Sequence, residues 1–152
     1  MSKRTIFYTT DYSDVPLIKL RYKDTEFYAI LDSGSESTLI DRRFVEKLEL
    51  EPSKTDISVS YIGFGGVSDM PLSNVNLHCS VTDDAGSSSY PIKINATLSD
   101  LSAIQAYFDK WNEEKISVPL LIGSDTLAWI EATIDFENQM FSFYEDTDEQ
   151  DR

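Results

Sequence analysis

An Asp-Ser-Gly triplet, Asp32-Ser33-Gly34, is the residue pattern in this 152-residue chain that is best suited to chemistry. Its aspartate directly follows a continuous apolar run from Phe27 to Leu31, which predicts a buried strand that ends in a tight turn. A carboxylate held at the end of a buried strand can act as a general base toward water. The triplet alone is a weak signal, because the same residues also form an ordinary Asx turn.

Most other catalytic chemistries lack the residues that they need. The chain has one histidine, His78, and one cysteine, Cys79, so an intrachain disulfide and a zinc site with several Cys or His ligands are excluded. These neighbours point to opposite faces of a strand, so we expect no Ser-His or Cys-His hydrolase, and we interpret Cys79 as a small core residue if it points inward. The Gly-Phe-Gly-Gly stretch at 63–66 lacks the third glycine of a dinucleotide fingerprint. We therefore expect carboxylate chemistry with no metal ion and no cofactor.

Length and charge limit the possible partners. The chain has 27 acidic and 13 basic residues and a formal net charge of −14, which argues against nucleic acid and anionic membranes as partners. No apolar run approaches the length of a membrane span, and a single cysteine is typical of a reducing compartment, so we expect a cytoplasmic protein. We predict one domain over residues 1–144, followed by an acidic disordered tail over 145–152.

The elements predicted around the triplet are mostly strands. Residues 57–77 alternate in hydrophobicity on both sides of the glycine cluster, which indicates a long hairpin with a glycine tip. Residues 120–123, Leu-Leu-Ile-Gly, repeat the pattern of an apolar strand that runs into a turn and a short helix. An amphipathic helix is predicted over 100–115, with Leu101, Ile104, Phe108 and Trp111 on one apolar stripe. A closing hairpin is predicted over 132–144, with Ala132, Ile134 and Phe136 on one face and Asp135 solvated on the other.

In their order and spacing these segments resemble the retropepsin-like aspartic proteases, the single-domain relatives of retroviral protease. The resemblance covers residues 17–143 and rests on 29–35 as the catalytic loop, on the hairpin around 62–66 as the flap, and on 120–125 followed by 132–136. It implies an all-β, retropepsin-type acid protease barrel with a flap hairpin and two or three short helices. It also implies an aspartic endopeptidase that cleaves extended polypeptide segments.

The resemblance assigns roles to individual residues. Asp32 is the implied catalytic residue, and it needs a second carboxylate close by, because two such groups share one proton and divide the acid and base work. The chain has one Asp-Ser/Thr-Gly triplet, so the second aspartate must come from a second copy in a homodimer. Ser33 would pin the two loops across the twofold axis, Gly34 would allow close backbone approach, and Ser35 would donate to the Asp32 carboxylate. The implied flap consists of Ile62, Gly63, Phe64, Gly65 and Gly66.

Two features depart from the family pattern. The helix over 100–115 lies where compact retroviral members have a shorter connection; we expect its stripe to pack on the core, with a groove wall or a dimer contact as the alternative. Ser124 and Asp125 replace the basic residue that retroviral members place after the matching glycine, and we interpret Asp125 as a helix cap.

Two other interpretations stay open. The same fold could serve as a catalytically silent dimerisation or peptide-binding module, and the triplet could be only a turn in an unrelated β-barrel. A cleavage assay on an unfolded protein distinguishes the protease from the silent module.

Overall fold

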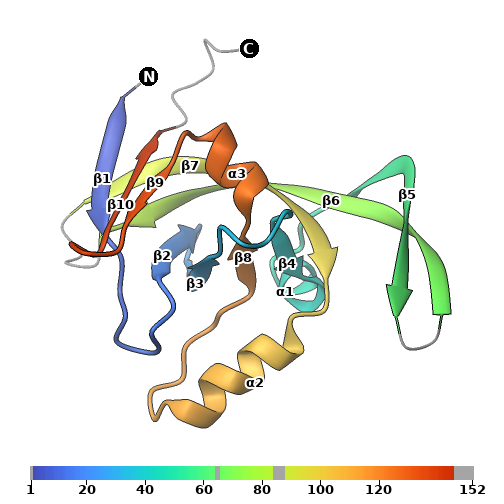
Figure 1. Ribbon diagram of the computed structural model, residues 1–152, viewed down its shortest axis with the longest axis horizontal. Helices are drawn as coiled ribbons and strands as arrows, with labels where there is room; N and C mark the ends of the chain where they lie inside the picture. Colours follow the sequence, from blue (N-terminus) through green and yellow to red (C-terminus); the bar gives the residue numbers. More distant parts are fainter. Residues whose placement is uncertain (1, 64–65, 84–87, 146–152) are drawn as a thin grey trace.

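A computed structural model describes residues 2–63, 66–83 and 88–145 of the chain, and its regular secondary structure is mostly β-strand (Figure 1). The strands are β1 Lys3–Phe7, β2 Leu17–Tyr22, β3 Thr25–Leu31, β4 Leu39–Asp41, β5 Ser53–Gly63, β6 Gly66–Thr82, β7 Ser89–Ser99, β8 Leu120–Ile122, β9 Thr133–Asp135 and β10 Met140–Tyr144. The helices are α1 Arg42–Lys47, α2 Ser102–Trp111 and α3 Ser124–Trp129. The predicted all-β class with two or three short helices is confirmed.

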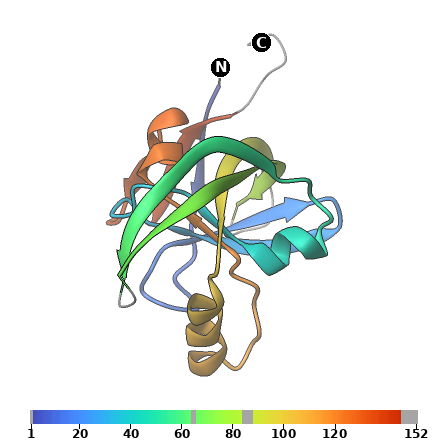
Figure 2. The same ribbon diagram turned by 90° about the vertical axis from the view of Figure 1, so that its right-hand side faces the viewer.

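Six strands close into a barrel. The larger sheet has the order β2-β3-β8-β4-β7-β6-β5, and an additional antiparallel pairing of β2 with β6 joins the sheet to itself. Strand β5 pairs with β6 beyond this closure, so these two strands form an arm that reaches away from the barrel (Figures 1 and 2). Closure leaves the barrel strands with few unpaired edges, which stabilises a small all-β domain.

The continuous apolar run before Asp32 forms a strand that is buried on both faces. Phe27, Ala29 and Leu31 of β3 point into the barrel core, whereas Ile30 packs in a second cluster outside the barrel wall. Because alternate side chains of a strand point to opposite faces, both faces need an apolar cover. Strand β8 pairs parallel to β3 and follows the same rule, with Leu121 in the second cluster.

Helix α2 supplies the cover of the second cluster. Phe108 is buried there and Ile104 packs beside it, which confirms the expected packing on the core. The side chain of Gln105 ties the helix to the chain that returns toward β8: its Nε2 donates to the Ile116 carbonyl oxygen at 2.8 Å, and its Oε1 accepts the Val118 N–H at 2.8 Å.

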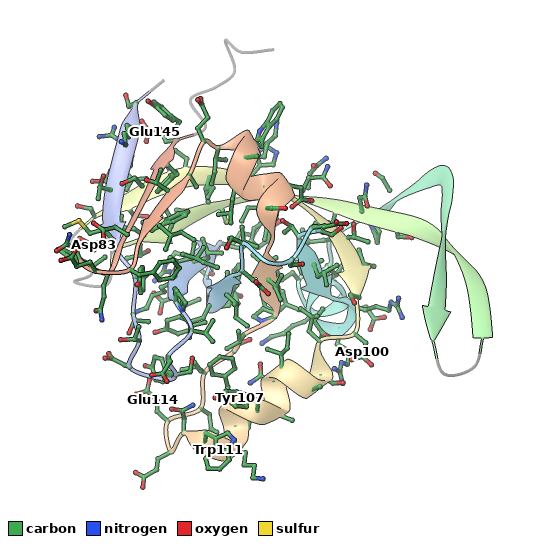
Figure 3. The ribbon with its side chains drawn as sticks, in the orientation of Figure 1. Asp83, Asp100, Tyr107, Trp111, Glu114 and Glu145 are labelled. Atoms are coloured by element: carbon green, nitrogen blue, oxygen red, sulfur yellow. The ribbon has the colours of Figure 1, made fainter. Side chains whose placement is uncertain are left out.

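The prediction that Trp111 belongs to the apolar stripe of α2 is wrong. Trp111 is 65% exposed, because the helix ends at this residue and the core lies under its middle turns. Tyr107 is also exposed, and Figure 3 labels both side chains on α2, with Trp111 at the end of the helix far from the barrel. The helix itself is shorter than the predicted span of 100–115.

The two ends of the domain form a separate three-stranded sheet in the order β1-β10-β9. The hairpin of β9 and β10 was predicted, whereas strand β1 was not. Glu145, the first residue of the predicted tail, is instead 8% exposed and pairs with Arg4 at 2.9 Å, next to β1 (Figure 3). Residues 146–152 lie outside the described residues.

Candidate active site

Asp32 follows the last residue of β3, at the point where the chain leaves the barrel wall. Its backbone N–H donates to the Ile122 carbonyl oxygen at 2.9 Å, so the end of β8 holds its main chain. Its Oδ1 accepts the Gly34 N–H at 3.0 Å, and its carbonyl oxygen accepts the Ser35 N–H at 3.1 Å. The side chain is half-buried, so the carboxylate has a fixed direction and still meets solvent.

Gly34 lies close to this carboxylate. A β-carbon at this position would come within 3.2 Å of Asp32 Oδ1. The absence of a side chain therefore lets the Gly34 N–H approach the carboxylate, and the role of this glycine in the active site stays a prediction.

Gly123 joins β8 to α3 and packs against the backbone of the loop that contains Asp32. A β-carbon there would lie 2.4 Å from the Ser37 carbonyl oxygen and 2.8 Å from that of Ser35. The following residue, Ser124, donates its N–H to the Ser35 carbonyl oxygen at 2.7 Å. The predicted repeat of strand, glycine and short helix over 120–129 therefore lies directly against the loop that contains the Asp-Ser-Gly triplet.

Ser35 does not act as expected. Its hydroxyl donates to the Ser37 carbonyl oxygen at 2.9 Å, so its single proton is not available to the Asp32 carboxylate. The reason is local: the turn brings the Ser37 carbonyl within reach of the Ser35 side chain.

Asp125 is not a simple helix cap either. The cap position of α3 is Gly123, and Asp125 lies in the first turn of the helix. Its carboxylate reaches across to Thr38, accepting the Thr38 hydroxyl at 2.7 Å and the Thr38 N–H at 3.2 Å. Thr38 was not among the predicted site residues. A hydroxyl residue six positions after Asp32 and directly before the apolar strand β4 is nevertheless a signal that the sequence contains.

Ser33 is exposed beside Asp32 and borders an open hollow of about 350 Å³. The other sides of this hollow come from α3 and from the segment around β9. Phe136, which also lines it, is 66% exposed. Ala132 and Ile134 line the same hollow, so Phe136 lies on the same side as these two residues, just beyond the end of β9 at Asp135.

The predicted hairpin is present, and its glycines lie at the tip. β5 and β6 pair antiparallel up to Gly63 opposite Gly66, and Ile62 pairs with Val67. Phe64 and Gly65 lie outside the described residues. The role of this hairpin as a flap stays a prediction.

The other titratable residues that the sequence singled out are Cys79, His78 and Asp135, and none of them belongs to the loop that carries Asp32. Cys79 is buried in the barrel core as a small apolar residue, and desolvation raises the pKa of its thiol to about 12. His78, its neighbour on β6, is exposed. Asp135 is exposed as expected, and hydrogen bonds from the Asn138 side chain and backbone lower the pKa of its carboxyl.

Within the ranges that the structure describes, no group of three or more His, Cys, Asp and Glu side chains is arranged to hold a metal ion. In the same ranges, no helix has the length and apolar character required to cross a membrane.

Many solved structures have a fold similar to that of this chain, including the following three. The retroviral protease-like domain of Ddi1 from Leishmania major has 14% identity and a TM-score of 0.47, with 85% of this chain and 87% of that chain covered. A retropepsin-like aspartic protease from Rickettsia conorii has 13% identity and a TM-score of 0.46, with 94% and 91% covered. EIAV protease in complex with the inhibitor HBY-793 has 15% identity and a TM-score of 0.44, with 84% and 98% covered.

Comparisons of sequence cover curated proteins and family models. No curated protein matches the chain. A family model described as aspartyl protease matches residues 18–104, which is more than half of the 152 residues and includes β3, Asp32 and both strands of the hairpin. The chain therefore belongs to the aspartyl protease family.

Proposed function

We propose that this protein is an aspartic endopeptidase whose active site forms between two copies of the chain, with Asp32 from each. The observation that carries the proposal is the Asp32 carboxylate, held by the Gly34 N–H at the end of a buried strand in a chain of the aspartyl protease family. The chain contains one Asp-Ser/Thr-Gly triplet, so a second copy is the source of the second carboxylate.

The reaction needs both carboxyl groups. Two carboxyls about 3 Å apart cannot both ionise, so the pair shares one proton. The ionised Asp32 takes a proton from water, and the protonated Asp32 of the other copy donates to the carbonyl oxygen of the peptide bond. The proposed mechanism has no covalent intermediate and uses no metal ion or cofactor.

The surface beside Asp32 supports a second copy as the partner. Ser33 is exposed at the rim of the hollow between α3 and β9, and Phe136 is exposed on the same hollow. In the proposed dimer Ser33 contacts the loop of the other copy, and the apolar part of this surface becomes buried. Burial of apolar surface is the main favourable contribution to such an association.

The glycine-tipped hairpin of β5 and β6 is the proposed flap. It extends from the barrel as an arm, so it can move without disturbing the core (Figure 1). A flap that closes over an extended peptide excludes water from the two carboxyls.

A cleavage assay with two matched variants tests the proposal. Asp32→Asn should fold normally and lose cleavage of casein and of a peptide library, because an amide can neither take a proton from water nor share one. Asp24→Asn removes one carboxylate from the exposed turn between β2 and β3 and should retain wild-type cleavage. Equal activity of Asp32→Asn and wild type would overturn the protease assignment. Binding of unfolded peptides without cleavage by wild type would favour the silent peptide-binding module.

A further inference from the structure

We propose that Thr38 and Asp125 form a positioning pair that fixes the loop of Asp32 against the turn at Gly123. This inference rests on the proposed protease function and adds two residues that the triplet does not contain. Among the described residues, the Asp32 carboxylate accepts its hydrogen bond from Gly34, and Thr38 and Asp125 bond to each other, so the pair would act through the backbone that carries Asp32.

The hydroxyl of Thr38 is fully used in hydrogen bonding. Thr38 is 1% exposed, and its Oγ lies 2.7 Å from Asp125 Oδ1, 2.6 Å from Thr126 Oγ and 3.0 Å from the Gly123 nitrogen. A carboxylate accepts only, so Thr38 donates its one proton to Asp125 and accepts from the Thr126 hydroxyl and the Gly123 N–H. A buried group with one donated and two accepted hydrogen bonds has a single favourable orientation.

The carboxylate of Asp125 is equally committed. Its Oδ1 accepts the Thr38 hydroxyl and the Thr126 N–H, each at 2.7 Å, and its Oδ2 accepts the Thr38 N–H at 3.2 Å. From the first turn of α3, Asp125 therefore accepts hydrogen bonds from both the backbone and the side chain of Thr38. A serine or alanine at position 125 could not bridge these two groups in the same way.

These contacts fix the far end of the Asp32 loop, whereas the near end is fixed separately. At the near end, the Ile122 carbonyl oxygen accepts the Asp32 N–H at 2.9 Å. Between the two ends, the Ser35 carbonyl oxygen accepts the Ser124 N–H at 2.7 Å. The segment 122–126 thus contacts the loop 32–38 at its start, middle and end, and the Thr38–Asp125 pair makes the last contact.

The consequence for the reaction is geometric. In the proposed dimer the two Asp32 carboxyls must lie about 3 Å apart, so a small shift of either loop separates them. Misplacement of a reacting group by about 1 Å can cost about a hundredfold in rate. Loss of the pair should therefore lower kcat more than it changes KM.

Two pairs of variants and one control test the proposal. Thr38→Val removes the hydroxyl with little change of shape, and Thr38→Ser restores it. Asp125→Ala removes both acceptors, whereas Asp125→Asn can keep one: its Oδ1 accepts the Thr38 hydroxyl and the Thr126 N–H, and only the longer contact with the Thr38 N–H is lost. Gln105→Ala is the control, because it removes two hydrogen bonds between α2 and the chain before β8, outside the Asp32 loop.

The expected result is a fall in kcat of about tenfold or more for Thr38→Val and Asp125→Ala, with KM nearly unchanged. Thr38→Ser should stay within about threefold of wild type, and Asp125→Asn should lie between wild type and Asp125→Ala, because it loses one of the two acceptor oxygens. Gln105→Ala should lower Tm without lowering kcat. Unchanged kcat in Asp125→Ala would overturn the proposal, as would an Asp125→Asn variant as impaired as Asp125→Ala. Asp125 is exposed, so its variants decide the question even if Thr38→Val does not fold.

Hydrogen exchange provides a readout that does not depend on cleavage. Asp125→Ala should speed amide exchange in peptides that cover 32–38, whereas Gln105→Ala should leave that segment unchanged. If wild type shows no Asp32-dependent cleavage, the proposed function fails, and the exchange result still decides whether the pair holds the loop. Exchange over 32–38 that is the same in Asp125→Ala and wild type would overturn the proposed pair independently.

Discussion

Gly123 lies at a position where any side chain collides with the loop that carries Asp32. A β-carbon there would come within 2.4 Å of a backbone carbonyl oxygen of Ser37, and backbone cannot rotate away as a side chain can. Gly123→Ala should therefore lower the free energy of unfolding by about 1–3 kcal/mol, the usual cost of overpacking. Chemical denaturation measures this change.

Gly34→Ala is the matched comparison for Gly123→Ala. Its added β-carbon would lie 3.2 Å from Asp32 Oδ1, a side-chain atom that can move. The Gly34 variant should keep most of its stability and lose activity, because the carboxylate is displaced. If the two alanine variants had equal unfolding free energies, the steric account of Gly123 would be wrong.

The buried thiol of Cys79 gives a prediction that depends on pH. Desolvation raises the pKa of this thiol to about 12, so at pH 9 only about one molecule in a thousand holds the reactive thiolate. Alkylation by iodoacetamide at pH 9, followed by mass spectrometry, should be very slow in the folded protein. It should become fast in guanidinium, where the thiol recovers its ordinary pKa. Equal rates in both conditions would show that Cys79 is accessible.

At the scale of single residues, the sequence predicted those site residues whose place follows from their position next to an apolar run. Asp32 and Gly123 were found because each directly follows an apolar run, and strand ends place such residues at one edge of a sheet. The hydroxyl of Ser35 could not be placed, since its partner depends on how the turn directs the Ser37 carbonyl. The link between Thr38 and Asp125 joins residues 87 positions apart and needs the fold itself.

At the scale of elements, the hairpin of β5 and β6 carries the next prediction. Gly63 and Gly66 face each other at its tip, beyond the part of β6 that closes the barrel. Changing Gly65 and Gly66 together to Val should lower kcat/KM with little loss of stability, because Gly66 lies at the end of the β5–β6 pairing, away from the barrel closure, and flap movement needs backbone freedom. Tm and cleavage kinetics of the double variant measure both effects, and an unchanged kcat/KM would make the hairpin only structural.

Elements were predictable where one periodicity dominates. The long hairpin follows from alternation, the helix α2 from helical spacing, and the strand that runs into Asp32 from an unbroken apolar run. Strand β1 was missed because Lys3–Phe7 has one inward apolar residue, Ile6, and pairs only with β10, far away in the sequence. Trp111 was placed on the core because the spacing does not show that α2 ends there.

At the scale of the whole molecule, the account depends on association of two strongly acidic chains. Each carries a formal charge of −14, so association must overcome electrostatic repulsion. The apolar residues around the Ser33 hollow, including the exposed Phe136, are the surface proposed to offset this repulsion. One shared active site then requires one intact Asp32 from each subunit.

Mixing subunits tests this central claim directly. Wild-type and Asp32→Asn chains are combined in varied ratios at constant total concentration and incubated until subunits have exchanged, and cleavage is then measured. If the site needs Asp32 from both copies, activity falls with the square of the wild-type fraction, to about a quarter in an equal mixture. Mixtures with Asp24→Asn should keep full activity at every ratio. A linear fall, with about half of the activity left in an equal mixture, would mean that each chain works with its own Asp32 alone and would contradict the account.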